Sequence, residues 1–266
     1  MKPKITGLIG RDIRHSLSPC IHRAFFEATG LDGDYRLFDV KPAGLEKIIG
    51  QLVSGVIHGI NVTMPYKTEI IKYCNDLSDT ASRCHAVNTL YIDHGRVMGE
   101  LTDLPGFVQA MEFHGIVGNS ALVLGSGGAA RAVVAGLWDT GFEQVSVVAR
   151  NPVTRAQLSE IFPGVSLNMP VLPVDLIVNA TPVQDMDILP KPMGDILDSA
   201  GVFFDLNYRG ITGGMRIADA IGRRNLNGLA MLIFQAAHSW QTWFGQDPLM
   251  ALDMSEIMRR CRYAEA

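Results

Sequence analysis

Two groups of residues in the sequence have the types and spacing that chemistry requires. The first is the stretch LVLGSGGAARA, where Gly125, Gly127 and Ala130 have the spacing G-x-G-x-x-G/A between an apolar run and a helical pattern. Small residues there allow a tight turn and a close approach of the backbone to a pyrophosphate, which N–H groups at the helix start can bind. A plain structural turn is the alternative, but the strand before the loop and the helix after it favour a dinucleotide site.

The end of the next predicted strand, in VVARNPVTR, belongs to the same site. Sites for NAD usually have an acidic residue here, roughly 20 residues past the glycines, which binds the ribose 2′-hydroxyl. This sequence has Arg150 instead, with Asn151 beside it and Arg155 one turn later. Because a planar guanidinium suits a phosphate, these residues predict NADP(H) rather than NAD(H). The alternative is that both arginines are solvated ends of a strand and a helix.

The second group consists of hydroxyl, amide and charged side chains at predicted strand ends in the first half, where ligands bind in an α/β sheet. Each has a structural alternative, since Ser18 and Asp103 could be helix caps and Asn88 a turn residue. Together they supply the hydrogen-bonding groups, one lysine and one aspartate that a small polyhydroxylated substrate requires. The members are Ser16, Ser18, Asn61, Thr63, Lys67, Asn88, Thr89, Thr102 and Asp103.

Lys67 follows Pro65 at the start of a predicted helix, PYKTEIIKYC. Proline suits the first helical position, so Lys67 is expected in the first turn, where the helix dipole disfavours a cation. Such a position costs stability but is useful to an acid/base group. A surface lysine that is merely tolerated at a helix start is the alternative. The neighbouring polar motifs and Asp103 favour the catalytic interpretation.

These groups are carried by strand and helix segments that alternate along the whole chain. The β-α-β order predicts an α/β fold of two domains, an N-terminal α/β substrate domain and a Rossmann-type dinucleotide-binding domain, with the active-site cleft between them. In the second half, short apolar runs such as SALVLG and VDLIVNAT are typical of buried parallel strands. The predicted domains are residues 1–104, completed by C-terminal helices in 235–266, and residues 105–234.

The composition limits the classes of partner. The 266 residues are 47% hydrophobic and 19% charged, which suits a large buried core, and the net charge of −4 gives no reason to expect nucleic-acid or membrane binding. Four cysteines without Cys-x-x-Cys spacing argue against a zinc site and a disulfide scaffold. No apolar run approaches the roughly 18 residues of a membrane span. We expect a reduced, cytoplasmic protein without a metal, either a monomer or a homodimer.

The order and spacing of HSLSP, NVTMPYK, AVNT, TD before a helix, GSGGAARA, NATP and GLAMLIFQAAHSW resemble the shikimate dehydrogenase family over essentially the whole chain. The resemblance implies reversible reduction of 3-dehydroshikimate to shikimate by NADPH, with Lys67 and Asp103 as the catalytic pair. The substrate-binding residues that it implies are Ser16, Ser18, Asn61, Thr63, Asn88, Tyr208 and Gln235. The cofactor-binding residues that it implies are Gly125, Ser126, Gly127, Gly128, Ala129, Ala130, Arg150, Asn151, Arg155, Thr181 and Met231.

The chain departs from the family pattern at several positions. Leu101 stands where an asparagine usually precedes the TD pair, His85 replaces a glycine before AVNT, and Arg23 replaces an asparagine after SPxxH. The proline that often follows the tyrosine is missing after Tyr208. These changes leave Lys67 and Asp103 untouched and suggest a divergent paralogue.

Three alternatives to shikimate oxidation stay open at this point. A paralogue could act on quinate or on an amino- or otherwise substituted shikimate. A non-catalytic ligand-binding paralogue is a different class, but a pure binder does not need a dinucleotide loop. A folate-type or amino-acid dehydrogenase is disfavoured by HSLSP and NVTMPYK. The histidines His15, His22, His85 and His238 are interpreted as packed or surface residues, and Trp240, Trp243 and Phe244 as packing.

Overall fold

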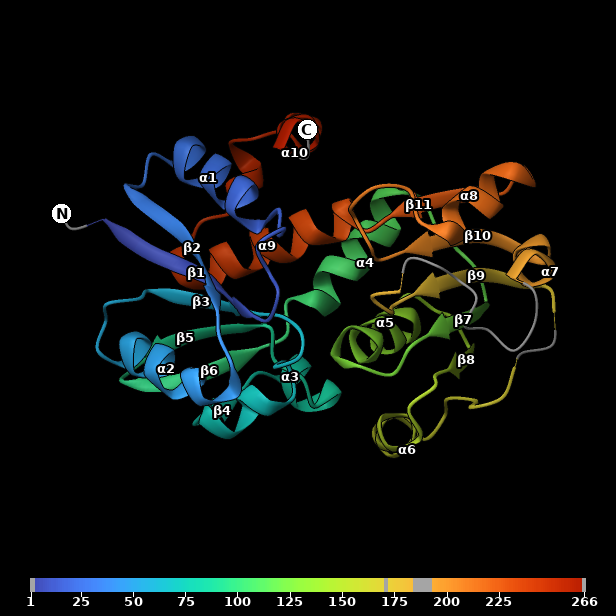
Figure 1. Ribbon diagram of the computed structural model, residues 1–266, viewed down its shortest axis with the longest axis horizontal. Coiled ribbons are helices and arrows are strands. Elements are labelled where there is room, and N and C mark those ends of the chain that lie inside the picture. Colours follow the sequence, from blue (N-terminus) through green and yellow to red (C-terminus); the bar gives the residue numbers. More distant parts are fainter. Residues whose placement is uncertain (1–2, 170–171, 184–192, 265–266) are drawn as a thin grey trace. The chain divides into compact units, whose positions relative to one another are not determined.

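The computed structural model describes residues 3–169, 172–183 and 193–264 (Figure 1). The chain divides into two compact units, one formed by residues 1–106 with 233–266 and the other by residues 107–232. It passes from one unit to the other within α4 (Asp103–Phe113) and again within α9 (Leu229–Phe244). The predicted α/β fold of two domains is confirmed, and the C-terminal segment joins the first unit.

The first unit contains a mixed sheet of six strands in the order β2-β1-β3-β5-β6-β4. The strands β2, β1 and β3 are parallel, whereas β5 runs antiparallel to both β3 and β6. Helix crossovers join the parallel strands, and a tight hairpin joins β5 to β6. The strand bounds are β1 Lys4–Gly10, β2 Gly33–Asp39, β3 Gly59–Val62, β4 Asp76–Leu77, β5 Thr89–Asp93 and β6 Arg96–Glu100.

The helices of this unit bury one face against the sheet. In α1 the apolar residues Ile21 and Phe25 are four apart and fully buried, and the helix ends at Gly30 in the left-handed conformation that favours glycine. The fully buried Trp240 of α9 packs edge-on against Phe26, which supports the interpretation of this aromatic group as packing. The remaining bounds are α1 Ser18–Thr29, η1 Pro42–Gly44, α2 Leu45–Val53, η2 Glu69–Tyr73, α3 Asp79–Cys84, η3 Pro248–Met250 and α10 Met254–Ala264.

The predicted helix over residues 65–74 is wrong. The Met64–Pro65 peptide is cis and lies in a turn, and only the short 3-10 helix η2 follows, from Glu69 to Tyr73. Lys67 therefore precedes the helical residues and does not lie in a first α-helical turn. The dipole argument for Lys67 does not apply.

His85 ends α3 in the left-handed conformation, with φ 46° and ψ 47°, and its backbone N–H donates to carbonyls of the last turn. Glycine adopts this conformation at least cost, which gives a physical reason for the glycine of the family pattern. The side chain of His85 is exposed.

The second unit contains a parallel sheet of five strands in the order β11-β10-β9-β7-β8. The prediction of buried parallel strands in the second half is confirmed, because residues 121–124 of β7 are all buried. The strand bounds are β7 Ser120–Leu124, β8 Gln144–Val148, β9 Val174–Asn179, β10 Ala200–Asp205 and β11 Arg224–Asn227. The helices are α5 Gly128–Asp139, α6 Pro152–Ile161, α7 Met193–Asp198 and α8 Gly213–Ala220.

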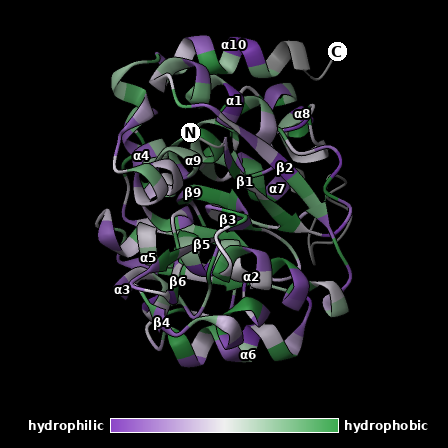
Figure 2. Ribbon diagram, turned by 90° about the vertical axis from the view of Figure 1, so that its left-hand side faces the viewer, coloured by the Kyte–Doolittle hydropathy of each residue, from purple (hydrophilic) through white to green (hydrophobic). Residues whose placement is uncertain are grey.

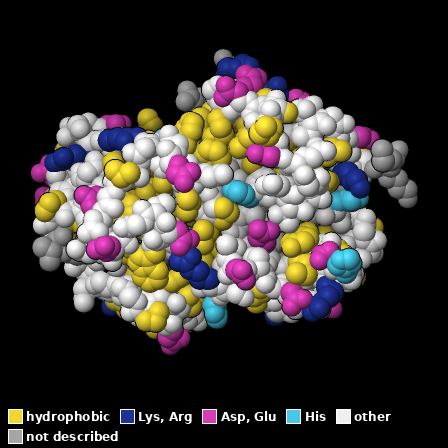
Figure 3. All heavy atoms as spheres, turned by 180° about the vertical axis from the view of Figure 1, so that it is seen from behind, with side chains coloured by type: hydrophobic (Ala, Val, Ile, Leu, Met, Phe, Trp, Pro, Cys, Tyr) yellow, Lys and Arg dark blue, Asp and Glu magenta, His cyan; other side chains and the backbone are white. Residues whose placement is uncertain are grey.

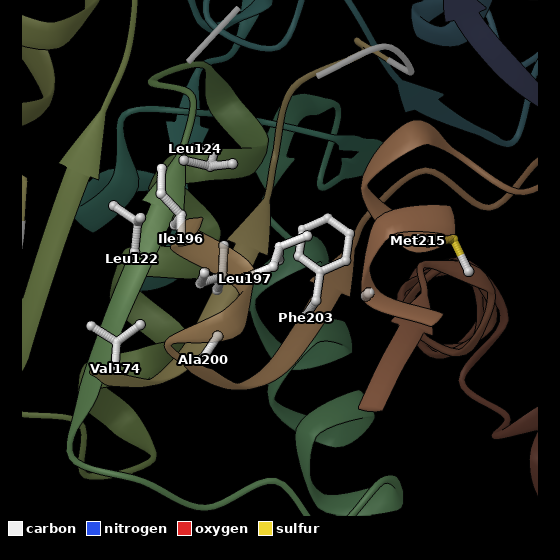
Figure 4. Close-up of a cluster of buried hydrophobic side chains, with 10 residues drawn as sticks. Leu122, Leu124, Val174, Ile196, Leu197, Ala200, Phe203 and Met215 are labelled. Carbon is white, nitrogen blue, oxygen red and sulfur yellow. The ribbon is translucent and has the colours of Figure 1, made fainter. Parts of the chain in front are cut away.

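One core cluster of the second unit lies between the sheet and the helices α7 and α8. Figure 4 shows Leu122 and Phe203 of two strands together with Ile196 and Leu197 of α7, and Met215 of α8 closes the cluster. Burial of this apolar surface contributes about 25 cal/mol per Å² to stability. Hydrophobic residues dominate the strand β9 in Figure 2, in agreement with its burial.

His22 is fully buried in the first unit, and its imidazole stacks on the Tyr35 ring with centroids 4.0 Å apart. Burial lowers the pKa of His22 from 6.5 to about 3, because the surroundings disfavour the imidazolium cation. The imidazole is therefore neutral in the folded protein near neutral pH. This agrees with the interpretation of His22 as a packed residue.

We expect His22 to make the folded protein less stable in mild acid. Between pH 6.5 and 3 the unfolded chain binds a proton that the folded chain does not, so the free energy of unfolding falls as the pH falls, by about 1.4 kcal/mol per unit. We expect the free energy of unfolding to fall between pH 7 and pH 5 by about 2 kcal/mol less in His22→Phe than in the wild type, as measured by urea unfolding at both pH values. Equal losses in both proteins would contradict this assignment. Burial also lowers the pKa values of His58, His114 and His238. These histidines are present in both the wild type and His22→Phe, so their effect cancels in the comparison.

Candidate active site

Lys67 and Asp103 meet in the first unit. The Lys67 Nζ donates to Oδ2 of Asp103, and the two side chains are only 15% and 7% exposed. A carboxylate and an ammonium removed from water in this way attract each other more strongly than a surface pair, at a desolvation cost that further hydrogen bonds must offset. The pair is therefore a costly feature that stability alone does not require.

The backbone around Lys67 is held on both sides. Its carbonyl accepts from the backbone N–H of Val87 at 2.8 Å. The neighbouring Tyr66 is fully buried, and its hydroxyl donates to the carbonyl of Val40 at 2.6 Å. These contacts fix Lys67 without a helix.

Asn88 holds the other oxygen of Asp103. The Asn88 Nδ2 group donates to Oδ1 of Asp103 at 3.0 Å and to Oε1 of Gln235 at 3.1 Å. The backbone N–H of Thr102 donates to Oδ1 of Asn88 at 2.7 Å, which fixes which end of the amide faces the carboxylate. A Cβ on Gly106 would lie 2.7 Å from the backbone nitrogen of Gln235, so glycine allows α4 to approach α9 at this point.

Asn61 and Asn88 share a cluster of three buried hydroxyls, which we call the hydroxyl cluster: Thr89, Thr102 and Ser239. Their oxygens lie 2.8–3.1 Å apart, and each residue is 0% exposed. The Asn61 Nδ2 group donates to Ser239 at 2.8 Å, while Tyr35 donates its hydroxyl proton to Oδ1 of Asn61 at 2.9 Å. The Asn61 amide is thus held at both ends.

The Ser239→Ala substitution should lower the free energy of unfolding by about 1–3 kcal/mol, because it removes an acceptor from the buried amide of Asn61. The substitution of the exposed Ser82 by alanine is the matched control and should change stability by less than about 0.5 kcal/mol. Urea denaturation of the three proteins provides the comparison. If Ser239→Ala and the control had equal free energies of unfolding, the hydrogen bonds of Ser239 would not contribute to stability.

The other polar residues predicted in the first unit lie near strand β1 or helix α1. The Ser16 hydroxyl donates to the Ser18 hydroxyl at 3.1 Å and accepts from the backbone N–H of Ser18 at 3.2 Å. The N-cap residue of α1 is Leu17, so the alternative of Ser18 as a helix cap is wrong. Thr63 directly follows β3 and is half-buried, and its backbone N–H donates to the carbonyl of Ile9 at 2.8 Å. Asp103, at the start of α4, accepts from Lys67 with Oδ2 and from Asn88 with Oδ1.

The glycine-rich loop of the second unit joins β7 to α5. Gly125 has φ 111°, and a Cβ there would lie 3.1 Å from the carbonyl oxygen of Ala180, so glycine is required. A Cβ on Gly127 would meet nothing within 4 Å, which leaves space in front of the backbone at the start of α5. The first turn of α5 has no acidic residue and no side-chain cap. Its N–H groups therefore suit an anion such as a pyrophosphate.

The predicted 2′-phosphate residues surround the start of α6. Arg150 and Asn151 are exposed, and Arg155 is half-buried. Oδ1 of Asn151 caps α6 by accepting from the backbone N–H of Val153 at 2.9 Å, which leaves its amide hydrogens for a ligand. The hydroxyls of Ser126 and Thr154 lie 2.6 Å apart and tie the glycine-rich loop to α6.

Buried Asp205 organises the loops that carry Thr181 and Tyr208 in the second unit. Its Oδ1 accepts from Asn179 at 3.0 Å and from the side chain of Asn207 at 2.7 Å. Asn207 also donates to the carbonyl of Thr181 at 3.0 Å, and Tyr208 follows it half-buried. Asn207 therefore connects two of the predicted site residues: it is hydrogen-bonded to the backbone of Thr181 and directly precedes Tyr208. Met231, in the first turn of α9, is buried.

Sequence reasoning missed Tyr35, Asp205 and Ser239. Ser239 reads as an ordinary helix residue, although its position four residues after Gln235 puts both on one helix face. Tyr35 and Asp205 lie in strands with no motif of their own.

Charged side chains of both signs are mixed on one face of the molecule. On the face shown in Figure 3, Lys and Arg side chains are interspersed with Asp and Glu and form no continuous basic area. Among the described residues, no helix is both long and apolar enough to span a bilayer.

A glycine-rich loop that suits a pyrophosphate on a parallel sheet, together with a buried Lys–Asp pair among amides and hydroxyls, is typical of a dinucleotide-dependent oxidoreductase of two α/β units. A shikimate dehydrogenase (NADP(+)) of Symbiobacterium thermophilum is 36% identical, with 91% of this chain and 90% of the relative covered. The chain belongs to the shikimate dehydrogenase family.

Further comparisons agree with this assignment. Residues 8–90 match the model of the shikimate dehydrogenase substrate binding domain. A shikimate dehydrogenase (NADP(+)) of Methanothermobacter thermautotrophicus is 33% identical over 97% of each chain. The crystal structure of the Thermus thermophilus shikimate 5-dehydrogenase in complex with NADP(H) and shikimate has a TM-score of 0.87 and 34% identity, covering 98% of this chain and 99% of that one.

Proposed function

We propose that the protein catalyses the reversible, NADP-dependent reduction of 3-dehydroshikimate to shikimate. The observation that carries this proposal is the buried Lys67–Asp103 ion pair, held by Asn88 among amides and hydroxyls. The Thermus thermophilus relative, solved with NADP(H) and shikimate, supports it.

The residues of the first unit orient the substrate and handle one proton. Ser16 and Ser18 bind the carboxylate, while Asn61, Thr63, Asn88 and Gln235 bind the hydroxyls or the ring. In the reducing direction Lys67 donates a proton to the carbonyl oxygen, and in oxidation it takes that proton back. Asp103 accepts from Lys67 and holds the ammonium group in position, and Asn88 in turn fixes the carboxylate.

In the second unit the chain offers a fitting cofactor site. NADPH supplies the hydride when bound. The backbone of residues 125–130 binds the pyrophosphate at the start of α5, and Arg150, Asn151 and Arg155 bind the 2′-phosphate. Thr181 and Met231 line the nicotinamide side, and Tyr208 contributes to binding of the substrate carboxylate.

We expect Arg150→Ala to raise the KM for NADPH by about 10–100-fold, because one charge-assisted hydrogen bond to a phosphate is worth about 1.5–3 kcal/mol. The KM for NADH should stay unchanged, since NADH has no 2′-phosphate. The control is Arg36→Ala, which removes an exposed arginine paired with Asp34 in the other unit. Initial rates with both cofactors provide the measurement. An equal rise for NADPH and NADH would contradict the phosphate role.

The function itself is tested by the absorbance of NADPH during incubation with 3-dehydroshikimate and, in reverse, with shikimate and NADP. We expect turnover in both directions. Tight binding of shikimate without any absorbance change, across a panel of cyclohexane acids, would favour a non-catalytic paralogue instead.

A further inference from the structure

Two cysteines lie where the C-terminal helix packs on α1. Figures 1 and 2 both show α10 beside α1 within the first unit. Among residues 254–261 of α10, the fully buried ones are Ile257 and Cys261, four apart on one face, whereas Cys20 is half-buried in the first turns of α1. The side chains of Cys20 and Cys261 are hydrogen-bonded to each other. All four cysteines are described and are thiols.

Charged residues surround this contact. Arg260, next to Cys261, donates to Glu27 of α1 at 2.6 Å and to Glu256 of its own helix at 2.8 Å, so ion pairs hold α10 on α1. Arg23 lies one turn after Cys20 on α1, at the position where the family pattern has asparagine. The charges that act on the Cys20 thiol are therefore those of Arg23 and Arg260, with Glu27 as the opposing charge.

The electrostatics of Cys20 differ from those of an ordinary buried thiol. The hydrogen bond from Cys261 and the nearby Arg23 and Arg260 lower the pKa of Cys20 from 9.0 to about 7, against the effect of burial. Burial alone raises the pKa of Cys74 to about 11. Near neutral pH, Cys20 is thus substantially a thiolate, and Cys74 is an internal reference that stays protonated.

We propose that Cys20 and Cys261 form an oxidisable dithiol, in which Cys20 reacts with hydroperoxides and Cys261 resolves the product into a disulfide. The Cys20 thiolate attacks one oxygen of hydrogen peroxide, an S–O bond forms, the O–O bond breaks, and the leaving hydroxide becomes water. The Cys261 sulfur, after losing its proton, attacks the Cys20 sulfur and displaces the second water. Two thiols lose two electrons, and one peroxide is reduced to two waters. The disulfide joins α10 to the helix that also carries Ser18.

The chemistry is tested on the full-length protein with hydrogen peroxide, followed by intact mass and peptide mapping. We expect the loss of two hydrogen atoms and one crosslinked peptide that contains Cys20 and Cys261. In Cys261→Ser, Cys20 should stop at the sulfenic acid and be trapped by dimedone, and Cys20→Ser should give neither product. Oxidation that begins at Cys74 or Cys84, or Cys20 that stays reduced while peroxide is consumed, would overturn the proposal.

A second measurement uses the unmodified fold and does not depend on the cysteine variants. Alkylation of native protein by iodoacetamide across pH 5.5–10 should give Cys20 a midpoint of about 7. Arg23→Asn, which restores the family residue, should slow alkylation of Cys20 at pH 7 by about threefold. A midpoint near 9 in the wild type, or no change in Arg23→Asn, would contradict the account of the site.

Discussion

Replacement of Lys67 by alanine is expected to lower kcat by about 10³-fold in both directions of the reaction, because the substitution removes the group that we propose exchanges the proton with the substrate oxygen. The KM for shikimate should change by less than about tenfold, since the other residues that we propose for substrate binding, among them Asn61 and Asn88, are unchanged. Steady-state kinetics with shikimate and NADP give both constants. The substitution also leaves Asp103 buried without its cation, which costs about 3–5 kcal/mol of stability, so folding must be verified by thermal unfolding.

Lys72→Ala is the matched control for this experiment. Lys72 is five residues further along, exposed, and paired with Glu69 at 3.0 Å on the 3-10 helix η2. It should keep the kinetic constants of the wild type. A Lys67→Ala enzyme with nearly normal kcat and only a raised KM would show that Lys67 binds substrate but does not transfer the proton.

Asp103→Asn should lower kcat by about 10²-fold, the second largest effect that we expect. The amide has the size of the carboxylate, but it carries no charge and cannot hold the Lys67 ammonium in the same way. Its effect should be far from additive with Lys67→Ala, because the two side chains act as one unit. Kinetics of the single and double variants measure this coupling.

Asp79→Asn provides the comparison for Asp103→Asn, since Asp79 is exposed at the start of α3. We expect wild-type kinetics in this variant. If the effects of Asp103→Asn and Lys67→Ala simply multiplied in the double variant, the two residues would act independently, and the proposed role of Asp103 would be wrong.

Much of the fold could be predicted from the sequence, because the strands β7 to β10 of the second unit are short apolar runs whose composition indicates burial, whereas the polar strand β11 has no such pattern. β7 and the glycine-rich loop that follows it are an example, since Gly125 has to adopt a positive φ there. The motif that carries Lys67 could not be predicted in the same way. A proline with several helix-forming residues after it is equally compatible with the turn and short 3-10 helix that the structure shows.

The candidate site was predicted as a set of residue types, and the structure supplies their partners. Lys67, Asn88, Asp103 and Gln235 are brought together in one unit from distant parts of the chain. The role of Ser239 could not be found, because a hydroxyl on an apolar helix carries no signal until the strands that face it are known. Leu101 is fully buried directly before Thr102, so the asparagine of the family pattern is replaced here by a core residue.

The measurement that tests the account most directly is a matrix of initial rates for shikimate and quinate, each with NADP and with NAD. We predict the highest kcat/KM for shikimate with NADP, because Arg150 and its neighbours suit the 2′-phosphate and the polar residues of the first unit suit the substrate's hydroxyls. Comparable or better turnover of quinate with NAD would contradict both the cofactor and the substrate that we propose.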